Sequence, residues 1–194
     1  MGVLLDENIS SRKLEKFPVV YLPNTAILSS REIEMLRDYV ANGGYLLATG
    51  LTGLYARPGQ QAPLATIEDL VGGKFISSLP DWDNHISLPA SADDLPPIST
   101  EIPPNWPFLV YGPAAVFELT TAQGYGHLYR PHRTLKQRKG EGNFSLPMSP
   151  DEAVGPAVLI NNYGQGKVIY LPCSPDVALA SEYRTVEPRL FFAT

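Results

Sequence analysis

The sequence has few residues of the kinds that form covalent or metal-bound cross-links. Its 194 residues include one cysteine and three histidines. A single cysteine excludes an internal disulfide and any zinc site built from several cysteines. His127 and His132 are five residues apart, which places them on opposite faces of a strand, with no cysteine beside them. The sequence therefore predicts no metal site and no cofactor.

Excess positive charge and long apolar runs are also missing. The formal net charge is −5 at pH 7, and Lys and Arg are scattered except at residues 130–139, which we interpret as a solvated loop. A protein that binds the phosphate backbone normally carries a basic face. No apolar stretch approaches the roughly 18–20 residues of a membrane span. We therefore expect neither nucleic acid nor a membrane as a partner.

The composition is that of a globular α/β domain with irregular connections. Hydrophobic residues make up 44% of the chain and charged residues 18%, while the 19 prolines and 16 glycines lie mostly in its middle. A chain of this length can form a single domain with a substantial core. We therefore interpret residues 1–194 as one domain.

The first third of the chain predicts a strand–helix–strand unit. Residues 3–5, 17–23 and 45–50 are short apolar runs typical of buried strands. Ser29 with Glu32 three residues later forms a capping-box pattern that opens a helix, which Gly43 and Gly44 end. This order indicates a mainly parallel sheet covered by helices.

The rest of the chain is less regular. Residues 51–107 are expected to form an irregular insertion with one short helix at 66–71, packed by Trp82 and Trp106. Residues 157–160 and 167–171 predict an antiparallel hairpin, in which Gly164 and Gly166 supply positive backbone dihedrals. The remaining expected elements are strands at 108–119 and 125–129, a loop at 136–149 and a terminal helix at 175–190.

Three segments together resemble a known family. They are VVYLPNTAILSSREIEMLRDYVANGGYLLATGLTGLY at residues 19–55, VYGPAAVFEL at residues 110–119 and GPAVLINNYGQGKVIYLP at residues 155–172. They look like the class I glutamine-amidotransferase-like domain attached to many glycoside hydrolases, called the trimerisation domain in β-galactosidases.

The resemblance implies a flavodoxin-like fold and a larger parent protein. Residues 3–5 match the second strand of that fold, so its first strand and helix are expected upstream of Met1. The chain would then be a fragment of a multi-domain protein with a sugar-cleaving barrel. The implied partners are other domains of the same polypeptide and further copies in a homo-oligomer.

The catalytic positions of that family are vacant in this sequence. An active amidotransferase has a cysteine on a sharp turn after a strand and a His-Pro-Glu pattern after the last strand. The matching turn here contains Gly50, Leu51 and Thr52, and Ser174-Pro175-Asp176 stands in place of His-Pro-Glu. Cys173 lies beside this position and is interpreted as a small, semi-buried apolar residue. The resemblance therefore predicts a non-catalytic accessory or oligomerisation domain.

Two other functions remain open from the sequence alone. One is an active hydrolase or amidotransferase that uses Cys173 or Thr52. The other is a carbohydrate-binding module whose aromatic side chains stack on sugars, with candidates Trp82, Trp106, Tyr125 and Tyr129. A glycosidase site needs two carboxylates at a set separation, and spacing singles out no pair among Asp81, Asp83, Asp93, Asp94, Glu101 and Glu118.

Overall fold

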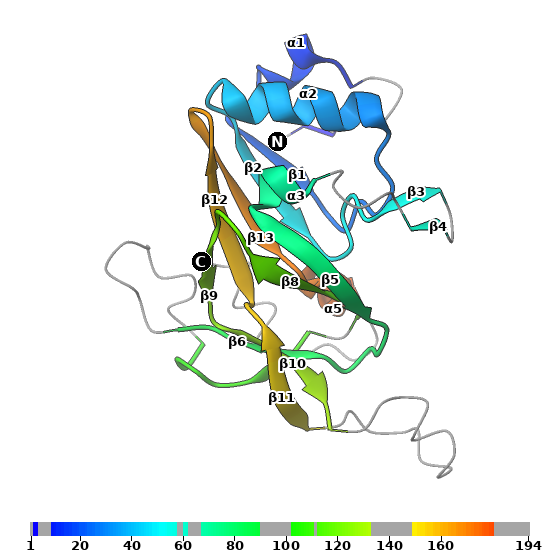
Figure 1. The fold of residues 1–194 in the computed structure, drawn as a ribbon, viewed down its shortest axis with the longest axis vertical. Coiled ribbons are helices and arrows are strands. Elements are labelled where there is room, and N and C mark those ends of the chain that lie inside the picture. Colours follow the sequence, from blue (N-terminus) through cyan, green and yellow to red (C-terminus); the bar gives the residue numbers. More distant parts are fainter. Residues whose placement is uncertain are drawn as a thin grey trace.

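The computed structural model describes residues 2–3, 9–57, 60–61, 67–89, 102–110, 112–132 and 149–180. They form a small mixed α/β domain that consists mainly of sheets, with few helices (Figure 1). Parts of three predicted elements, at residues 4–5, 136–148 and 181–190, lie outside the described residues. Among the described residues, no helix is both long and apolar enough to cross a membrane.

The central sheet has five strands in the order β1-β2-β13-β12-β9. They are β1 (Val19–Leu22), β2 (Tyr45–Thr49), β13 (Gly166–Leu171), β12 (Val158–Tyr163) and β9 (Gln123–Tyr125). β1, β2 and β13 are parallel, whereas β12 is antiparallel to both of its neighbours. The predicted hairpin is confirmed, but the sheet is mixed rather than mainly parallel, because β12 and β9 extend it in antiparallel pairs.

The helix α2 (Ser30–Ala41) connects the parallel strands β1 and β2 and lies across one face of the sheet, next to the short α1 (Ser11–Leu14) (Figure 1). Its predicted capping box is confirmed: the Ser29 hydroxyl accepts from the Glu32 N–H, and the Glu32 carboxylate accepts from the Ser29 N–H at 2.7 Å. The helix ends at Ala41, and Gly43 follows with a φ of 103°. Local sequence signals therefore fix both ends of this helix.

The prediction of an irregular insertion at 51–107 is wrong for its described part. That part contains β3 (Tyr55–Arg57), β4 (Gln60–Gln61), α3 (Glu68–Val71), β5 (Gly73–Leu79) and β6 (His85–Ser87). Of these, α3 is the predicted short helix, ended by Gly72 with a φ of 72°. β5 pairs with β8 (Ala114–Leu119), and β6 joins a second sheet. The strands that pair with β5 and β6 lie far along the chain, so no local sequence pattern could predict these two strands.

The second sheet has four strands, ordered β11-β10-β6-β7. They are β11 (Pro150–Gly155), β10 (His127–Pro131), β6 and β7 (Phe108–Leu109). Two strands predicted as continuous are each divided between sheets: 108–119 becomes β7 and β8, and 125–129 becomes β9 and β10. The second break lies at Gly126, where φ is 62° and an added Cβ would collide with the Ser87 carbonyl oxygen. Only glycine fits there without strain.

Two hydrophobic cores lie on opposite faces of the central sheet. The first is formed with α2 and α3 and includes Val168 and Tyr170 of β13. The second is formed with the four-stranded sheet and includes Leu171, with Ile169 packed against it. Because side chains alternate along a strand, β13 contributes to both cores. β8 does the same through Ala115 on one side and Val116 on the other.

The tip of the β12–β13 hairpin packs closely on the end of α2. Gly164 has the predicted positive φ, at 59°. Gly166 was predicted to have one too, and this is wrong. An added Cβ there would collide with the carbonyl oxygens of Gly44 and Val40. Gly166 is therefore needed for close backbone approach, not for its dihedral angle.

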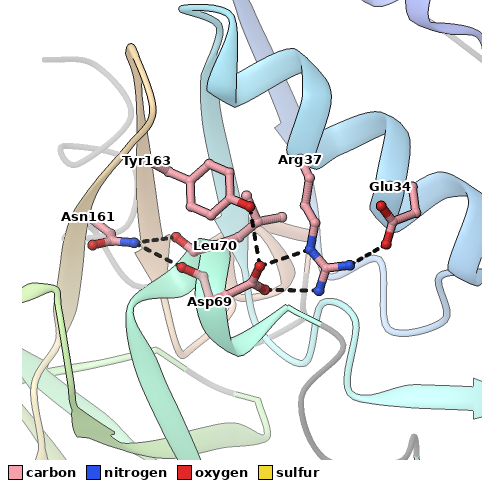
Figure 2. Close-up of polar contacts among 6 residues, drawn as sticks. All are labelled: Glu34, Arg37, Asp69, Leu70, Asn161 and Tyr163. Carbon is pink, nitrogen blue, oxygen red and sulfur yellow. Dashed lines mark hydrogen bonds and ion pairs between the residues drawn. The ribbon is translucent and has the colours of Figure 1, made fainter.

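A polar clamp joins α2, α3 and β12 at the edge of the first core (Figure 2). Asn161 of β12 donates its amide N–H groups to the carbonyl oxygens of Asp69 and Leu70, at 3.1 and 2.9 Å. Arg37 of α2 binds the Asp69 carboxylate through two nitrogens, at 2.9 and 3.0 Å. Tyr163 donates to the same carboxylate at 3.4 Å. These contacts hold the C-terminal end of α3, whose carbonyl groups lack helical partners.

Candidate functional site

The carboxyl ends of the parallel strands β1, β2 and β13 meet at one edge of the central sheet. In open α/β sheets, ligands and catalytic groups gather at this edge. Five polar residues lie there, and we call them the carboxyl-edge cluster: Tyr21, Asn24, Thr49, Ser174 and Asp176. The sequence had singled out Ser174 and Asp176. Tyr21 and Asn24 were missed, although a Pro-Asn pair directly after a strand could have indicated Asn24.

Thr49 at the end of β2 and Thr52 in the turn after it hold backbone groups in place. Thr49 accepts from the Asn24 N–H at 3.0 Å and donates to Asp176 Oδ1 at 3.2 Å. Thr52 is buried, accepts from the Thr25 N–H at 3.0 Å and donates to the Thr49 carbonyl at 2.7 Å. The hydroxyl of Thr52 is therefore occupied by structural hydrogen bonds, and no histidine lies within the carboxyl-edge cluster.

Gly50 is in the turn where the sequence resemblance predicts a vacant nucleophile position, and neighbouring side chains close the space there from two sides. Gly50 has a φ of 64°, and an added Cβ would collide with Ser174 Oγ and Asn24 Oδ1. Asn24 Oδ1 also accepts from the N–H of Leu51 at 2.9 Å, and the Tyr170 hydroxyl donates to the Gly50 carbonyl at 2.5 Å. A side chain at position 50 therefore has no path from this turn into solvent, as a nucleophile there would need.

Asp176 is the titratable group of the cluster. It lies in the first turn of α5 (Pro175–Ala180). Burial raises its pKa above the ordinary 3.8, while hydrogen bonds from its own N–H and from Thr49 lower it in part. Burial and the nearby Asp176 carboxyl raise the pKa of Tyr21, whose hydroxyl is hydrogen-bonded to Asp176. Tyr21 is 39% exposed, whereas Thr49 and Ser174 of the same cluster are buried.

Replacing Asp176 with Asn should change how stability depends on pH. A raised folded-state pKa means that the folded state binds more protons between the two pKa values. The stability that this proton binding contributes is fully present below the pKa of the unfolded state. It is lost as pH rises through the pKa of the folded state. The free energy of unfolding of Asp176→Asn, minus that of the wild type, should therefore increase between about pH 3.5 and about pH 7. Urea denaturation of both proteins at both pH values measures this difference in the free energy of unfolding. A difference that stays constant or falls as pH rises would contradict the raised pKa of Asp176.

Cys173 and Ser174 are buried at the end of β13. Burial, with a smaller effect of Asp176, raises the pKa of the Cys173 thiol to about 12. Cys173 is fully buried, more so than the semi-buried position expected, and belongs to the second core. Ser174 Oγ has no hydrogen-bond partner among the described residues. A thiol held neutral and away from solvent is a poor nucleophile.

The four candidate sugar-stacking aromatics do not form one platform. Trp82 and Trp106 are 46% and 58% exposed, so the prediction that they pack the insertion is wrong. They precede β6 and β7, which are antiparallel, so they lie at opposite ends of that strand pair. Tyr125 is on the central sheet, whereas Tyr129 is on the second sheet and contacts Ser87.

The remaining candidates for acid–base or metal chemistry are separate from the carboxyl-edge cluster. His85 is buried on β6, and burial lowers its pKa. His127 lies on β10 with its ring against Tyr129, and Glu118 is exposed on β8. Asp93, Asp94 and Glu101 lie outside the described residues. Within the described part of the chain, no three His, Cys, Asp or Glu residues are placed to hold a metal ion.

Comparison with known proteins relates the chain to others by structure only. No protein-family model matches it, and no curated protein matches its sequence. Among solved structures, α-L-fucosidase isoenzyme 2 from Paenibacillus thiaminolyticus aligns with a TM-score of 0.65 at 20% identity, over 92% of this chain and 24% of its own. The β-galactosidase from Rahnella sp. R3 aligns with a TM-score of 0.56 at 14% identity, over 82% of this chain and 20% of its own. A thua-like protein from Bacteroides uniformis aligns with a TM-score of 0.51 at 17% identity, over 84% of this chain and 62% of its own.

These similarities concern the fold. The chain spans about a fifth of the GH42 β-galactosidase chains that it resembles, 19% and 20% for two of them. It therefore shares its fold with a portion of chains that are glycoside hydrolases.

Proposed function

We propose that this chain is a non-catalytic accessory domain of a glycoside hydrolase and that it contributes to subunit association. In the finer form of the proposal, it is a class I glutamine-amidotransferase-like domain with a flavodoxin-like fold, equivalent to the trimerisation domain of β-galactosidases. The structural similarity to part of several glycoside hydrolase chains supports the parent class.

The geometry of the carboxyl edge is the observation that carries the non-catalytic role. Gly50 occupies the turn where a nucleophile would stand, and Asn24 and Ser174 close the space around it. Cys173 is buried with a raised pKa, and Thr52 is hydrogen-bonded to two backbone groups. A nucleophile needs both access and a base within hydrogen-bond reach. Neither alternative residue, Cys173 or Thr52, meets both conditions.

The open edge and face of β1 support the proposed association. Among the described residues, β1 pairs only with β2. Val19, Tyr21 and Tyr45 project from the face opposite α2 and are 54%, 39% and 50% exposed, and we call them the open face. Exposed apolar side chains gathered on one surface are typical of an interface. A further strand of the parent protein, another of its domains or a second subunit would cover them.

The first experiment is to measure the mass of the native gene product with an antibody raised against this chain. A product several times larger than 21.2 kDa is expected. The whole protein should then hydrolyse glycosides, and deleting these residues should alter its assembly rather than its chemistry. A native product near 21.2 kDa would contradict the accessory-domain proposal.

A variant of the open face tests the association in the whole protein. Replacing Val19 and Tyr45 with Glu should raise the dissociation constant between subunits at least about tenfold, because charge would enter an apolar interface. Ile76→Glu on β5 is the matched control, since Ile76 is equally exposed, at 53%, but lies on a different sheet. Light scattering after size exclusion measures the assembly. Equal effects of the two variants would contradict an interface at the open face.

A further inference from the structure

A small hollow lies at the β9 edge of the central sheet, remote from the carboxyl-edge cluster. Its volume is about 160 Å³, and its lining includes Gln123, Tyr125, Ile160, Asn162 and Lys167. Ligand sites for drug-sized molecules have volumes of about 300 Å³ or more. The hollow therefore has room for a single small ring.

Strand register brings these five residues to one face. Ile160 of β12 is opposite Gln123 of β9, and Asn162 is opposite Lys167 of β13. Tyr125 is two residues from Gln123 and therefore projects from the same face. Three strands thus supply the polar groups from a regular sheet, which is a more rigid support than a loop.

The polar groups of the hollow offer hydrogen-bond donors. In the described part of the chain, the Lys167 ammonium and the Asn162 amide have no hydrogen-bond or ion-pair partner. Gln123 uses its carbonyl oxygen to accept from the Tyr125 hydroxyl at 2.7 Å, which leaves its amide N–H groups available. None of the lining residues is acidic. The hollow therefore suits a ligand that presents several oxygen acceptors.

Tyr125 and Ile160 supply the apolar part of the lining. Tyr125 is partly buried, packs against the second core, and has its hydroxyl fixed by Gln123. A ring held in this way costs little entropy when a ligand stacks on it. A fixed aromatic ring beside amide and ammonium donors matches the alternating C–H and hydroxyl surfaces of a pyranose.

We infer that the hollow formed by Gln123, Tyr125, Ile160, Asn162 and Lys167 binds one monosaccharide unit. The sugar stacks on Tyr125, and its hydroxyl oxygens accept from Lys167, Asn162 and Gln123. The site is a single weak subsite, distinct from the dispersed four-aromatic platform considered from the sequence. The choice of a galactoside as the probe rests on the proposed function, whereas the site itself rests on the geometry of the hollow.

The test is a titration of the 194-residue chain with methyl β-D-galactopyranoside, followed by ¹H–¹⁵N NMR. For so few contacts we expect a dissociation constant of about 1–10 mM. Saturable shifts should appear at residues 121–125 and 160–167, including the side-chain amides of Gln123 and Asn162. Tyr125→Ala and Lys167→Met should each weaken binding about tenfold, whereas Tyr125→Phe keeps the ring and should stay within about threefold. Trp106→Phe is the matched control outside the hollow and should bind like the wild type.

Three outcomes would overturn the inference. They are no shifts at 100 mM sugar, a dissociation constant that is unchanged in Tyr125→Ala, and shifts produced by sodium acetate but not by the galactoside, which would indicate an anion site at Lys167. The spectrum of each variant shows whether it is folded, so a lost site is distinguished from a lost fold. This titration needs no activity of a parent protein. If the galactoside does not bind, the accessory-domain proposal is unaffected. If the accessory-domain proposal is wrong, the titration still decides whether the hollow binds a sugar.

Discussion

Replacing Asn161 with Asp is expected to lower the free energy of unfolding by about 3 kcal/mol or more. Asn161 is 2% exposed, and its amide N–H groups donate to the carbonyl oxygens of Asp69 and Leu70. In the Asp variant, a carboxylate oxygen would face these two carbonyl oxygens. Two buried acceptors would lose their donor, and a charge would be buried without a cationic partner.

Asn162→Asp is the matched control. It makes the same chemical change one residue along β12, at a side chain that is exposed and without a hydrogen-bond partner among the described residues. Its stability should stay within about 0.5 kcal/mol of the wild type. Urea denaturation at neutral pH measures both variants. Equal losses would contradict the structural role of the clamp, as would a fully stable Asn161→Asp.

The second large effect concerns the thiol of Cys173. In the folded chain it should react with a thiol reagent at least about a thousandfold more slowly than in guanidinium, because reaction requires an opening that few molecules populate at any time. Full burial removes access, and a pKa of about 12 leaves very little thiolate at neutral pH. Absorbance of the released chromophore from a disulfide reagent gives both rates.

An exposed thiol provides the reference rate for this experiment. Ser78→Cys, made together with Cys173→Ala, places a cysteine at an exposed position on β5 and should react within minutes in the folded state. If Cys173 in the wild type reacted as fast as this reference, the active-thiol alternative would return. Loss of turnover on Cys173→Ala in the whole protein would support that alternative directly.

The elements that could be predicted from the sequence have local causes. The capping box of Ser29 and Glu32 sets the start of α2, and the glycines beyond Ala41 set its end. The β12–β13 hairpin joins two apolar runs through a glycine-bearing turn, so its register also follows from neighbouring residues. In both cases the stabilising contacts lie within a few residues of each other.

The elements that could not be predicted depend on distant partners. β6 is three residues long and contains His85 and Ser87, so it carries no strand-like pattern, yet it pairs with β7 and β10. The carboxyl-edge cluster shows the same limit. The hydrogen bond from Thr49 to Asp176 spans 127 residues, and Asn24 reaches the turn after β2 across 27. The sequence resemblance could single out Gly50 and Asp176. The contacts that close the space around Gly50 and partly bury Asp176 form only in the folded chain.

The place of β13 in the central sheet has a consequence for the order in which the molecule can assemble. β13 is the last strand of the described chain, yet it lies between β2 and β12 and supplies side chains to both hydrophobic cores. During synthesis, residues 19–49 can form their strand–helix–strand unit early, but its parallel partner arrives more than a hundred residues later. Neither core can close before residue 171 has left the ribosome. Sheet contacts of such long sequence separation are slow to form, so apolar surface stays uncovered until β13 has been synthesised, and binding by a chaperone would protect it until then.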